Sequence, residues 1–323
     1  MISTFLSLFT AGTLMTNDVP ATTPHVMPWN ESVLLEATAI PQKNEKNIAP
    51  VIEAEAAIVV DLKNGLILYE KDIHTPLYIA SLTKLMTVTI ILEENSRDEV
   101  VTISKEVTET PGKRIWLAQG EKITVENLLF ASLIESANDA AVALAEHNAG
   151  SIDEFVLKMN EKSQELGLHS TSFINPTGLD EDEIPLDTET EDIISEEPLE
   201  SESEEEEKLQ PMGNISTAYD LTLLGRYAYG KSFIRRAVSK KELEVASTNE
   251  ALQHKLKTTN ALLDSYLPAL GLKTGTTDYA GECFIAIIEN ENGNDILTVV
   301  LNSPARFQET KVLADWTLRT YTW

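Results

Sequence analysis

Residues 54–69 read AEAAIVVDLKNGLILY, and this stretch decides how the folded part of the chain begins. Two apolar runs, 54–62 and 66–69, are separated by Lys63-Asn64-Gly65. An Asn-Gly pair between apolar runs is a strong local signal for a β-hairpin, because both residues tolerate the positive φ of a tight turn. The stretch therefore predicts two antiparallel strands.

Helical patterns follow this hairpin, and a second pair of strands lies near the C-terminus. The first helix is expected from about Ser81 to Glu94, and the others at 125–134, 136–148, 151–166, 216–229 and 306–320. The strands are expected at 282–289 and 295–302, around a turn-rich connection. Because strands from both ends must share one sheet, the order predicts an α+β fold: an antiparallel sheet flanked by helices, with an inserted, mainly helical subdomain.

The acidic charge of the chain is concentrated in one segment. Of the 52 acidic residues, 16 lie between Asp180 and Glu207, where no basic residue occurs. The rest of the chain holds 36 acidic and 25 basic residues, which is typical of a moderately acidic globular surface. The run predicts a disordered, solvated insert at 180–210, and the absence of a basic cluster argues against nucleic-acid binding.

The N-terminal residues predict segments outside the main folded domain. Residues 1–15 are apolar, although no Lys or Arg precedes Lys43, and they are followed by a stretch rich in Pro, Thr and Asn. We expect a signal or leader segment at 1–22, a linker at 23–50 and one folded domain at 51–323.

Cysteine and histidine usage excludes several kinds of site. The single cysteine, Cys283, rules out an internal disulfide and lies in an apolar run that predicts a buried, inert thiol. The five histidines are scattered and form no HExxH pair, so a zinc hydrolase has no support. The reaction that the motifs below predict needs no metal or organic cofactor.

Three short motifs carry the chemistry: Ser81-Leu82-Thr83-Lys84, Ser136-Ala137-Asn138 and Lys273-Thr274-Gly275. Each one alone is common, and a second Ser-x-Asn occurs at 247–249. Alone, Ser81 would be interpreted as a helix cap and Asn138 as an exposed helical residue. Together and in this order, the motifs are the set found in β-lactamases and penicillin-binding proteins.

The spacing within the motifs has a physical reason. Residues three apart on a helix share a face, so Lys84 Nζ can reach Ser81 Oγ. A neutral lysine can accept the serine proton, and burial or a second cation, for which Lys273 is the natural candidate, lowers the pKa in that direction. Ser136 and Asn138 offer a hydroxyl and an amide for proton relay and substrate binding. The motifs thus predict acyl transfer with Ser81 as nucleophile.

The sequence also predicts how the substrate is held. Gly275 has no side chain where a substrate must lie close to a strand. The helix start at Ser81 and the strand after Gly275 can each present a backbone N–H to an oxyanion.

The sequence also resembles the low-molecular-weight penicillin-binding proteins, which are serine-type D-alanyl-D-alanine carboxypeptidases. The resemblance runs from about Ala54 to Trp323, interrupted by the acidic insert, and is carried by these stretches: IASLTKLMT (79–87), NLLFASLIESANDAAVALAEH (127–147), FVLKMNEKSQELGL (155–168), NPTGL (175–179), ISTAYDL (215–221), GLKTGTTDYAG (271–281) and Arg306-Phe307. It implies a β-lactamase/transpeptidase-like fold.

The resemblance implies a role for each matched residue. Ser81 would be acylated by the penultimate D-alanine with Lys84 as general base, and Ser136, Asn138 and Lys273 would complete the proton network. The N–H groups of Ser81 and Thr276 would form the oxyanion hole, and Thr274 and Arg306 would bind the terminal carboxylate. The expected partners are peptidoglycan stem peptides and β-lactams. We expect a monomer that acts outside the cytoplasm, with peripheral membrane association.

Three alternatives remain. A peptidoglycan D,D-endopeptidase would use the same motifs. A β-lactamase of the class A kind would need a Glu-x-x-Leu-Asn stretch, which is absent from the sequence. An inactive penicillin-fold binding protein would not need the complete set of catalytic residues.

Overall fold

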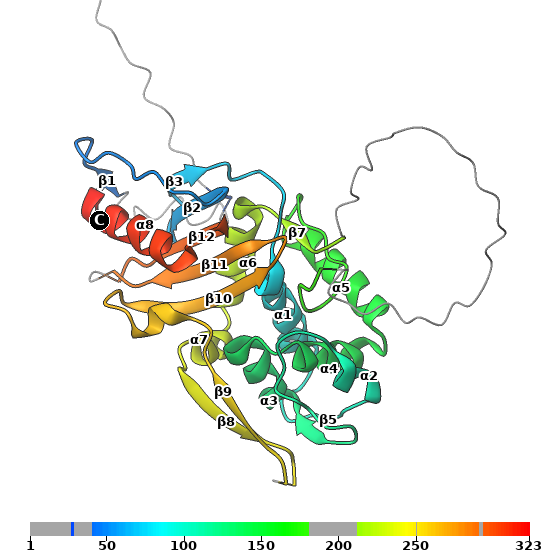
Figure 1. The fold of residues 1–323 in the computed structure, drawn as a ribbon. Helices are drawn as coiled ribbons and strands as arrows, with labels where there is room; N and C mark the ends of the chain where they lie inside the picture. The colour runs from blue at the N-terminus through cyan, green and yellow to red at the C-terminus, as the bar shows by residue number, and fades with distance from the viewer. Residues whose placement is uncertain (1–26, 29–40, 181–211, 250, 291–292) are drawn as a thin grey trace, which may run out of the picture.

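The structure is a computed structural model and describes residues 27–28, 41–180, 212–249, 251–290 and 293–323. Its centre is a five-stranded antiparallel sheet in the order β10-β11-β12-β2-β3 (Figure 1). The strands are β2 (Ala56–Asp61), β3 (Ile67–Lys71), β10 (Ala269–Thr277), β11 (Gly281–Ile288) and β12 (Ile296–Ser303). The predicted hairpin is β2–β3, and strands from both ends of the chain share one sheet, as the sequence predicted.

The sheet is buried on both faces because its strands alternate their side chains between two hydrophobic cores. Along β2, Ala56, Ile58 and Val60 belong to the larger core, while Ala57 and Val59 belong to the smaller one. This alternation follows from the two-residue period of a strand. A run that is apolar at every position, like the first run of the hairpin, is what a strand covered on both sides requires.

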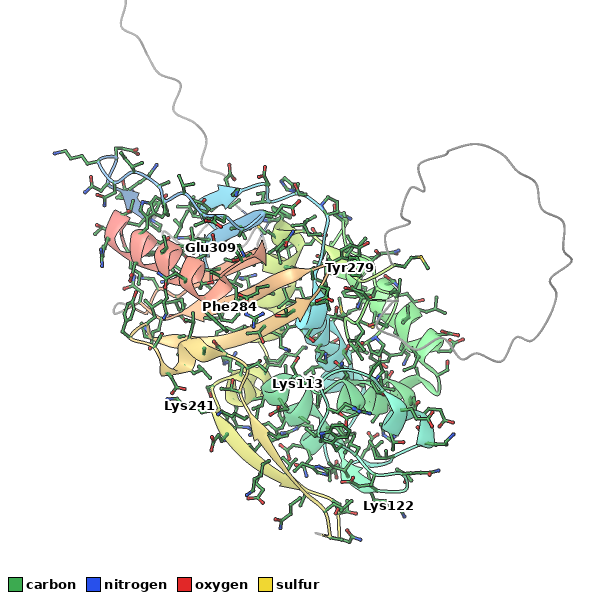
Figure 2. The ribbon with its side chains drawn as sticks, in the orientation of Figure 1. Lys113, Lys122, Lys241, Tyr279, Phe284 and Glu309 are labelled. Atoms are coloured by element: carbon green, nitrogen blue, oxygen red, sulfur yellow. The ribbon has the colours of Figure 1, made fainter. Side chains whose placement is uncertain are left out.

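One face of the sheet is covered by the C-terminal helix α8 (Arg306–Thr320), which lies across β11 and β12. Leu313 and Ala314 of this helix are fully buried with Phe284 of β11. Glu309 fastens the same helix, because its carboxylate accepts the N–H of Ala54 and the hydroxyl of Ser303 (Figure 2). The start of α8 is thereby fixed at the end of the sheet where β12 finishes.

The other face of the sheet is covered by helices of the inserted block (Figure 1). Helix α1 (Lys84–Glu94) is buried from Lys84 to Ile91 and forms the centre of this layer. Around it lie α2 (Lys105–Glu109), α3 (Val125–Phe130), α4 (Asn138–Ala149), α5 (Ile152–Glu165), α6 (Ala218–Tyr229) and α7 (Ser232–Val238). A helix that is apolar on all sides is stable only in such an interior position.

Small two-stranded sheets complete the fold. These are β4 (Leu77–Tyr78) with β7 (Ile215–Ser216), β5 (Val100–Thr102) with β6 (Lys122–Thr124), β8 (Glu242–Ala246) with β9 (Gln253–Lys257), and β1 (Gln42–Lys43) with β13 (Tyr321–Thr322). None of these pairs was expected from the sequence. All of these strands except β8 and β9 have only two or three residues, too few for a periodic signal.

Two details of the predicted elements differ from the structure. The Lys273-Thr274-Gly275 motif was placed before the C-terminal strands, but it lies inside β10, the edge strand of the sheet. Ser136 was placed at the start of a helix, but α4 begins at Asn138. In both cases the polar residues of a motif hide the hydrophobic period on which the prediction depends.

Part of the segment predicted as a linker, 23–50, contacts the domain. Strand β1 pairs with β13, and Met27 is buried with its N–H bonded to the Gly65 carbonyl. The acidic insert predicted at 180–210 lies outside the described residues except for Asp180, and the leader predicted at 1–22 lies wholly outside them. Within the described part of the chain, no helix has the length and apolar character needed to cross a membrane.

Candidate active site

Ser81 lies on a 3₁₀ turn, Ala80–Thr83, at the entrance to α1. In such a turn residues i and i+3 are eclipsed, so Lys84 lies directly over Ser81. The preceding residue, Ala80, has a φ of 46°, which a residue with a side chain adopts only when its surroundings enforce it. Gly178 is part of that enforcement, since a Cβ at this glycine would lie 1.9 Å from the Ala80 carbonyl oxygen. The turn that carries Ser81 is therefore held rigidly.

Lys84 has no exposed surface, and its Nζ contacts three oxygen atoms. Nζ lies 2.8 Å from Ser81 Oγ, 2.6 Å from Asn138 Oδ1 and 2.7 Å from the Thr177 carbonyl oxygen. Burial lowers the pKa of Lys84 to about 7, with Asp139 opposing this change and the charge of Lys113 adding to it. Near neutral pH the amine therefore exists partly as a base, within reach of the serine hydroxyl.

The second motif follows a π-helical turn, Ala131–Glu135, and Ser136 itself is left-handed with a φ of 63°. Single π turns and left-handed residues occur often at functional sites, where they redirect a side chain. Here the turn ends at Ser136, and the extended Ala137 lies between Ser136 and Asn138, the first residue of α4, whose side chain contacts Lys84. The irregular backbone of residues 131–138 thus sets the positions of the Ser136 and Asn138 side chains.

The loop that begins at Pro111 holds Asn138. The Pro111 carbonyl accepts a hydrogen bond from Asn138 Nδ2 at 2.9 Å, and the Lys113 carbonyl accepts the Asn138 N–H at 2.7 Å. Gly112 lies between them, and a Cβ there would come within 2.6 Å of Asn138 Nδ2. Both amide atoms of Asn138 are thus engaged, with Oδ1 directed to Lys84.

The third motif brings a second buried lysine to the site. Lys273 is 1% exposed, and its Nζ donates to Ser136 Oγ at 2.7 Å and to the Thr274 carbonyl at 2.8 Å. Burial holds the pKa of Lys273 well below its usual value, and the charges of Lys84, Lys113 and Arg306 lower it further. Lys273 and Ser136 form a pair that can pass a proton to or from a bound substrate.

The edge strand β10 approaches the nucleophile at Gly275. A Cβ on Gly275 would lie 3.1 Å from the Ser81 nitrogen and 2.9 Å from the Ile79 carbonyl oxygen, so only glycine allows this approach. Thr276, the next residue, lies beside Ser81 in the cleft lining. The expected oxyanion hole of the Ser81 and Thr276 N–H groups is compatible with this approach of the strand.

Arg306, the first residue of α8, closes one end of the site. Its guanidinium donates to the Gly275 carbonyl at 2.7 Å and to the Thr276 hydroxyl. Nearby, the hydroxyls of Thr259 and Thr274 lie 2.6 Å apart. A guanidinium beside two threonine hydroxyls is a suitable site for a carboxylate.

These groups line a cleft of about 450 Å³ between β10 and the helical subdomain. Lys113 and Arg306 lie in its wall, Lys84 and Lys273 lie directly beneath Ser81 and Ser136, and none of the described lining residues carries a carboxylate. The charges of Lys113 and Arg306, which no carboxylate among these described lining residues offsets, favour an anionic ligand. A nucleophile with a depressed-pKa base and a carboxylate site is equipped for acyl transfer from a peptide that ends in a free carboxylate.

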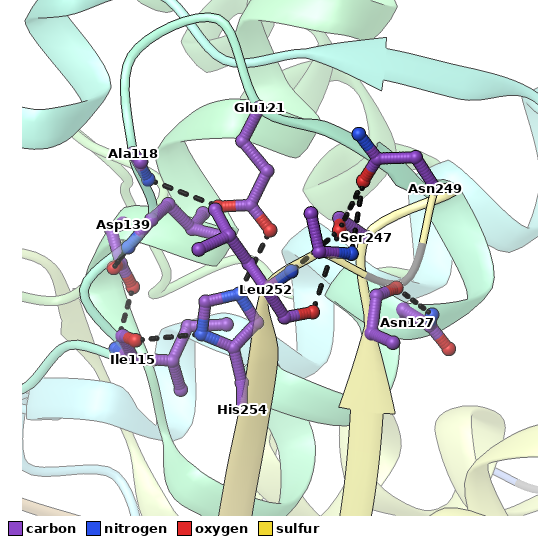
Figure 3. A network of polar contacts seen from close by, with 12 residues as sticks. Ile115, Ala118, Glu121, Asn127, Asp139, Ser247, Asn249, Leu252 and His254 are labelled. Atoms are coloured by element: carbon purple, nitrogen blue, oxygen red, sulfur yellow. Dashed lines mark hydrogen bonds and ion pairs between the residues drawn. The ribbon is translucent and has the colours of Figure 1, made fainter.

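A buried polar network supports the loop from behind (Figure 3). The Asp139 carboxylate accepts the N–H groups of Ile115 and Leu117, and burial raises its pKa. His254 of β9 contacts the Ile115 carbonyl through Nδ1 at 3.0 Å and Glu121 through Nε2 at 2.8 Å. The loop is therefore fastened both to α4 and to the β8–β9 hairpin.

The structure brings together all of the residues selected from the sequence: Ser81, Lys84, Ser136, Asn138, Lys273, Thr274, Gly275, Thr276 and Arg306. Sequence reasoning assigned no role to Lys113, Thr177 or Thr259, which also reach the site. For Thr177 the NPTGL stretch offered a signal, since Asn-Pro and Thr-Gly predict a tight turn. The turn is held by Asn175 Oδ1, which accepts the Thr177 and Gly178 N–H groups.

The remaining candidate for reactivity is inert. Cys283 is fully buried, as predicted, and burial raises the pKa of its thiol to about 12, which disfavours the reactive thiolate. In the described part of the chain, no group of three or more His, Cys, Asp or Glu side chains is arranged to hold a metal ion.

Comparison with known sequences identifies one family. Residues 43–305 match the family described as D-alanyl-D-alanine carboxypeptidase. D-alanyl-D-alanine carboxypeptidase DacF of Bacillus subtilis is 32% identical over 252 residues, covering 76% of this chain and 57% of DacF. The chain thus spans less than two thirds of the length of this relative.

A second relative and a solved structure extend the comparison. The D-alanyl-D-alanine endopeptidase of Pseudomonas aeruginosa is 28% identical over 256 residues, covering 77% of this chain and 73% of that protein. The crystal structure of penicillin-binding protein D2 from Listeria monocytogenes in its ampicillin-bound form matches with a TM-score of 0.66 and 30% identity, covering 84% of this chain and 99% of the other. The predicted fold class is thereby confirmed.

Proposed function

Because this chain belongs to the D-alanyl-D-alanine carboxypeptidase family, we propose that it is a serine enzyme that removes the terminal D-alanine from peptidoglycan stem peptides. The observation that carries the proposal is the contact between Lys84 Nζ and Ser81 Oγ, at 2.8 Å, in a site where the lysine is fully buried. Such a lysine loses its charge near neutral pH and can act as a base.

In the proposed acylation step, neutral Lys84 takes the Ser81 proton as Oγ attacks the carbonyl of the penultimate D-alanine. Asn138 Oδ1 and the Thr177 carbonyl hold Nζ in line with Oγ. The N–H groups of Ser81 and Thr276 receive the charge that develops on the carbonyl oxygen. The two fixed contacts of Nζ support an acylation step that needs little rearrangement.

In the proposed departure of the leaving group, Ser136 gives a proton to the D-alanine nitrogen as the C–N bond breaks and takes one back from Lys273, its neighbour at 2.7 Å. The proton that Lys84 took from Ser81 replaces the one that Lys273 gave, so the amine leaves and both lysines return to their starting states. The terminal carboxylate is held by Arg306 and Thr274. A water molecule then takes the place of the departed D-alanine, and the same bases activate it to hydrolyse the ester on Ser81, since the reverse proton path is equally available. Because the substrate is peptidoglycan, the enzyme is proposed to act outside the cytoplasmic membrane.

The second candidate function is that of an endopeptidase that cleaves cross-linked peptides. The similarity to the Pseudomonas aeruginosa endopeptidase supports this candidate. A β-lactamase has less support, because the described residues that line the cleft include no glutamate to activate a water molecule. Penicillin is expected to acylate Ser81 as a substrate mimic. The Listeria monocytogenes relative, whose structure holds ampicillin, supports this expectation.

The test uses the purified chain with two substrates: a pentapeptide that ends in D-alanyl-D-alanine, and a cross-linked peptide dimer. Release of free D-alanine from the first, with the dimer unchanged, supports the carboxypeptidase. Conversion of the dimer to monomers with little D-alanine release supports the endopeptidase. If neither reaction occurs with protein that unfolds cooperatively, and Ser81→Ala behaves identically, the proposal is wrong.

A further inference from the structure

Lys113 lies in the wall of the cleft, and the mechanism above does not use its side chain. The residue follows α2 on the loop that holds Asn138, and its backbone carbonyl accepts the Asn138 N–H. Its side chain is 48% exposed, whereas Lys84 and Lys273 are buried. Figure 2 shows Lys113 at the boundary between the sheet and the helical subdomain. The residue thus presents a cation to whatever occupies the cleft.

The Lys113 side chain forms an ion pair with Glu135. Its Nζ lies 3.2 Å from Glu135 Oε1, and the Glu135 side chain is only 18% exposed. Glu135 is itself fixed by the Lys257 N–H, which it accepts at 2.5 Å through its other oxygen. An ammonium has three donors, so a single carboxylate contact leaves donors for a ligand. Lys113 is therefore a positioned cation with spare hydrogen-bonding capacity.

The position of Lys113 relative to β10 indicates which part of a substrate it meets. Thr274, Gly275, Thr276 and Arg306 form one wall of the cleft, and Lys113 belongs to the opposite wall with Ser136 and Asn138. A peptide extended along the edge of β10 directs alternate side chains to opposite sides. Lys113, on the subdomain side of the cleft, is the lining cation that a side chain on one of these two sides can meet.

On the basis of the carboxypeptidase function proposed above, we propose that Lys113 is a specificity-determining residue that binds a side-chain carboxylate on the amino-acid residue preceding the D-alanyl-D-alanine pair. The terminal carboxylate is assigned to Arg306 on the other wall, so the two cations recognise two separate anions. The enzyme then prefers stem peptides whose residue before the pair has a free carboxylate over those in which this group is amidated.

The test compares two peptides that differ only in this group: N-acetyl-glutamyl-D-alanyl-D-alanine and N-acetyl-glutaminyl-D-alanyl-D-alanine. The measured quantity is the ratio of their kcat/KM values for D-alanine release. A partly exposed ion pair contributes a roughly 1.5- to fivefold preference for the carboxylate peptide. In Lys113→Met the ratio falls to about one, and in Lys113→Arg the preference is kept.

The ratio is used because the charge of Lys113 also lowers the pKa of Lys84. That influence changes both peptides equally and cancels in the ratio. The matched control is Lys122→Met, which removes an exposed lysine of β6 in the same subdomain, away from the cleft lining. This control leaves the ratio at its wild-type value.

Failure of this inference is distinguishable from failure of the proposed function. A wild-type ratio near one, or a ratio that Lys113→Met does not change, overturns the role of Lys113 while D-alanine release continues. If the wild type releases no D-alanine from either peptide, the proposed function fails first. Labelling by a fluorescent penicillin shows that each variant is folded and competent for acylation.

Discussion

The pH dependence of acylation follows from the environment of Lys84. The base must be neutral to accept the Ser81 proton, so acylation slows as pH falls through the Lys84 pKa of about 7. With that pKa, half of the molecules carry the base at pH 7 but only about 1% do at pH 5, so acylation is expected to be about 50-fold slower at pH 5. Above pH 8 the rate should change by less than about twofold.

Burial sets the fraction of Lys84 that is neutral at pH 7. An ordinary lysine with a pKa of about 10.4 would be neutral in fewer than about 1 in 1,000 molecules at pH 7. Enclosing Lys84 between Asn138 and Thr177 therefore raises the fraction of active base by about three orders of magnitude. The gain depends on the side chain staying fully out of water.

The assay is the second-order rate of labelling by a fluorescent penicillin between pH 5 and pH 9, at constant ionic strength. Circular dichroism at each pH controls for unfolding. A midpoint near pH 7 supports the reasoning. A rate that keeps rising toward pH 10, or that does not change with pH while the protein stays folded, would refute it.

Three further predictions test separate parts of the account. Asn138→Asp places a carboxylate beside Lys84 Nζ, which raises the Lys84 pKa, so penicillin labelling at pH 7 should fall more than about tenfold and its midpoint should move to higher pH. Gly178→Ala introduces a Cβ against the Ala80 carbonyl at a φ of 85°, and the free energy of unfolding in urea should drop by roughly 2 kcal/mol or more, with slower acylation. Leu313→Ala opens a cavity between α8 and the sheet and should cost about 2–5 kcal/mol of stability, while the labelling rate of the folded protein stays unchanged; a large loss of rate would contradict the separation of core and site.

The sequence predicted the parts of the fold that have clear periodicity. The Asn-Gly hairpin, the long helices and the paired strands near the C-terminus each present several apolar residues at a regular spacing, and they occur where expected. The strand β10 was not recognised as carrying the third motif, since Lys273 and its threonines interrupt the apolar pattern. Lys273 and Thr274 are nevertheless buried, because their side chains have polar partners in Ser136 and Thr259.

The site was predictable where it depends on motifs and unpredictable where it depends on packing. Lys84 and Ser81 are close because of their spacing on one turn, which the sequence states directly. Lys113 and Thr177 reach the site on loops whose paths depend on contacts between residues far apart in the sequence. For example, the backbone of Ile115 is bonded to the side chains of His254 and Asp139. No local pattern encodes such contacts, so the structure was needed to find them.

The central claim is that Ser81 is the acylated nucleophile, and mass mapping of the penicillin-treated protein tests it most directly. The protein is digested after treatment, and the peptide that carries the penicilloyl mass is sequenced by fragmentation. The account predicts a single adduct on Ser81, which is lost in Ser81→Ala. An adduct on Ser136 or any other residue, or full labelling of Ser81→Ala, would contradict it.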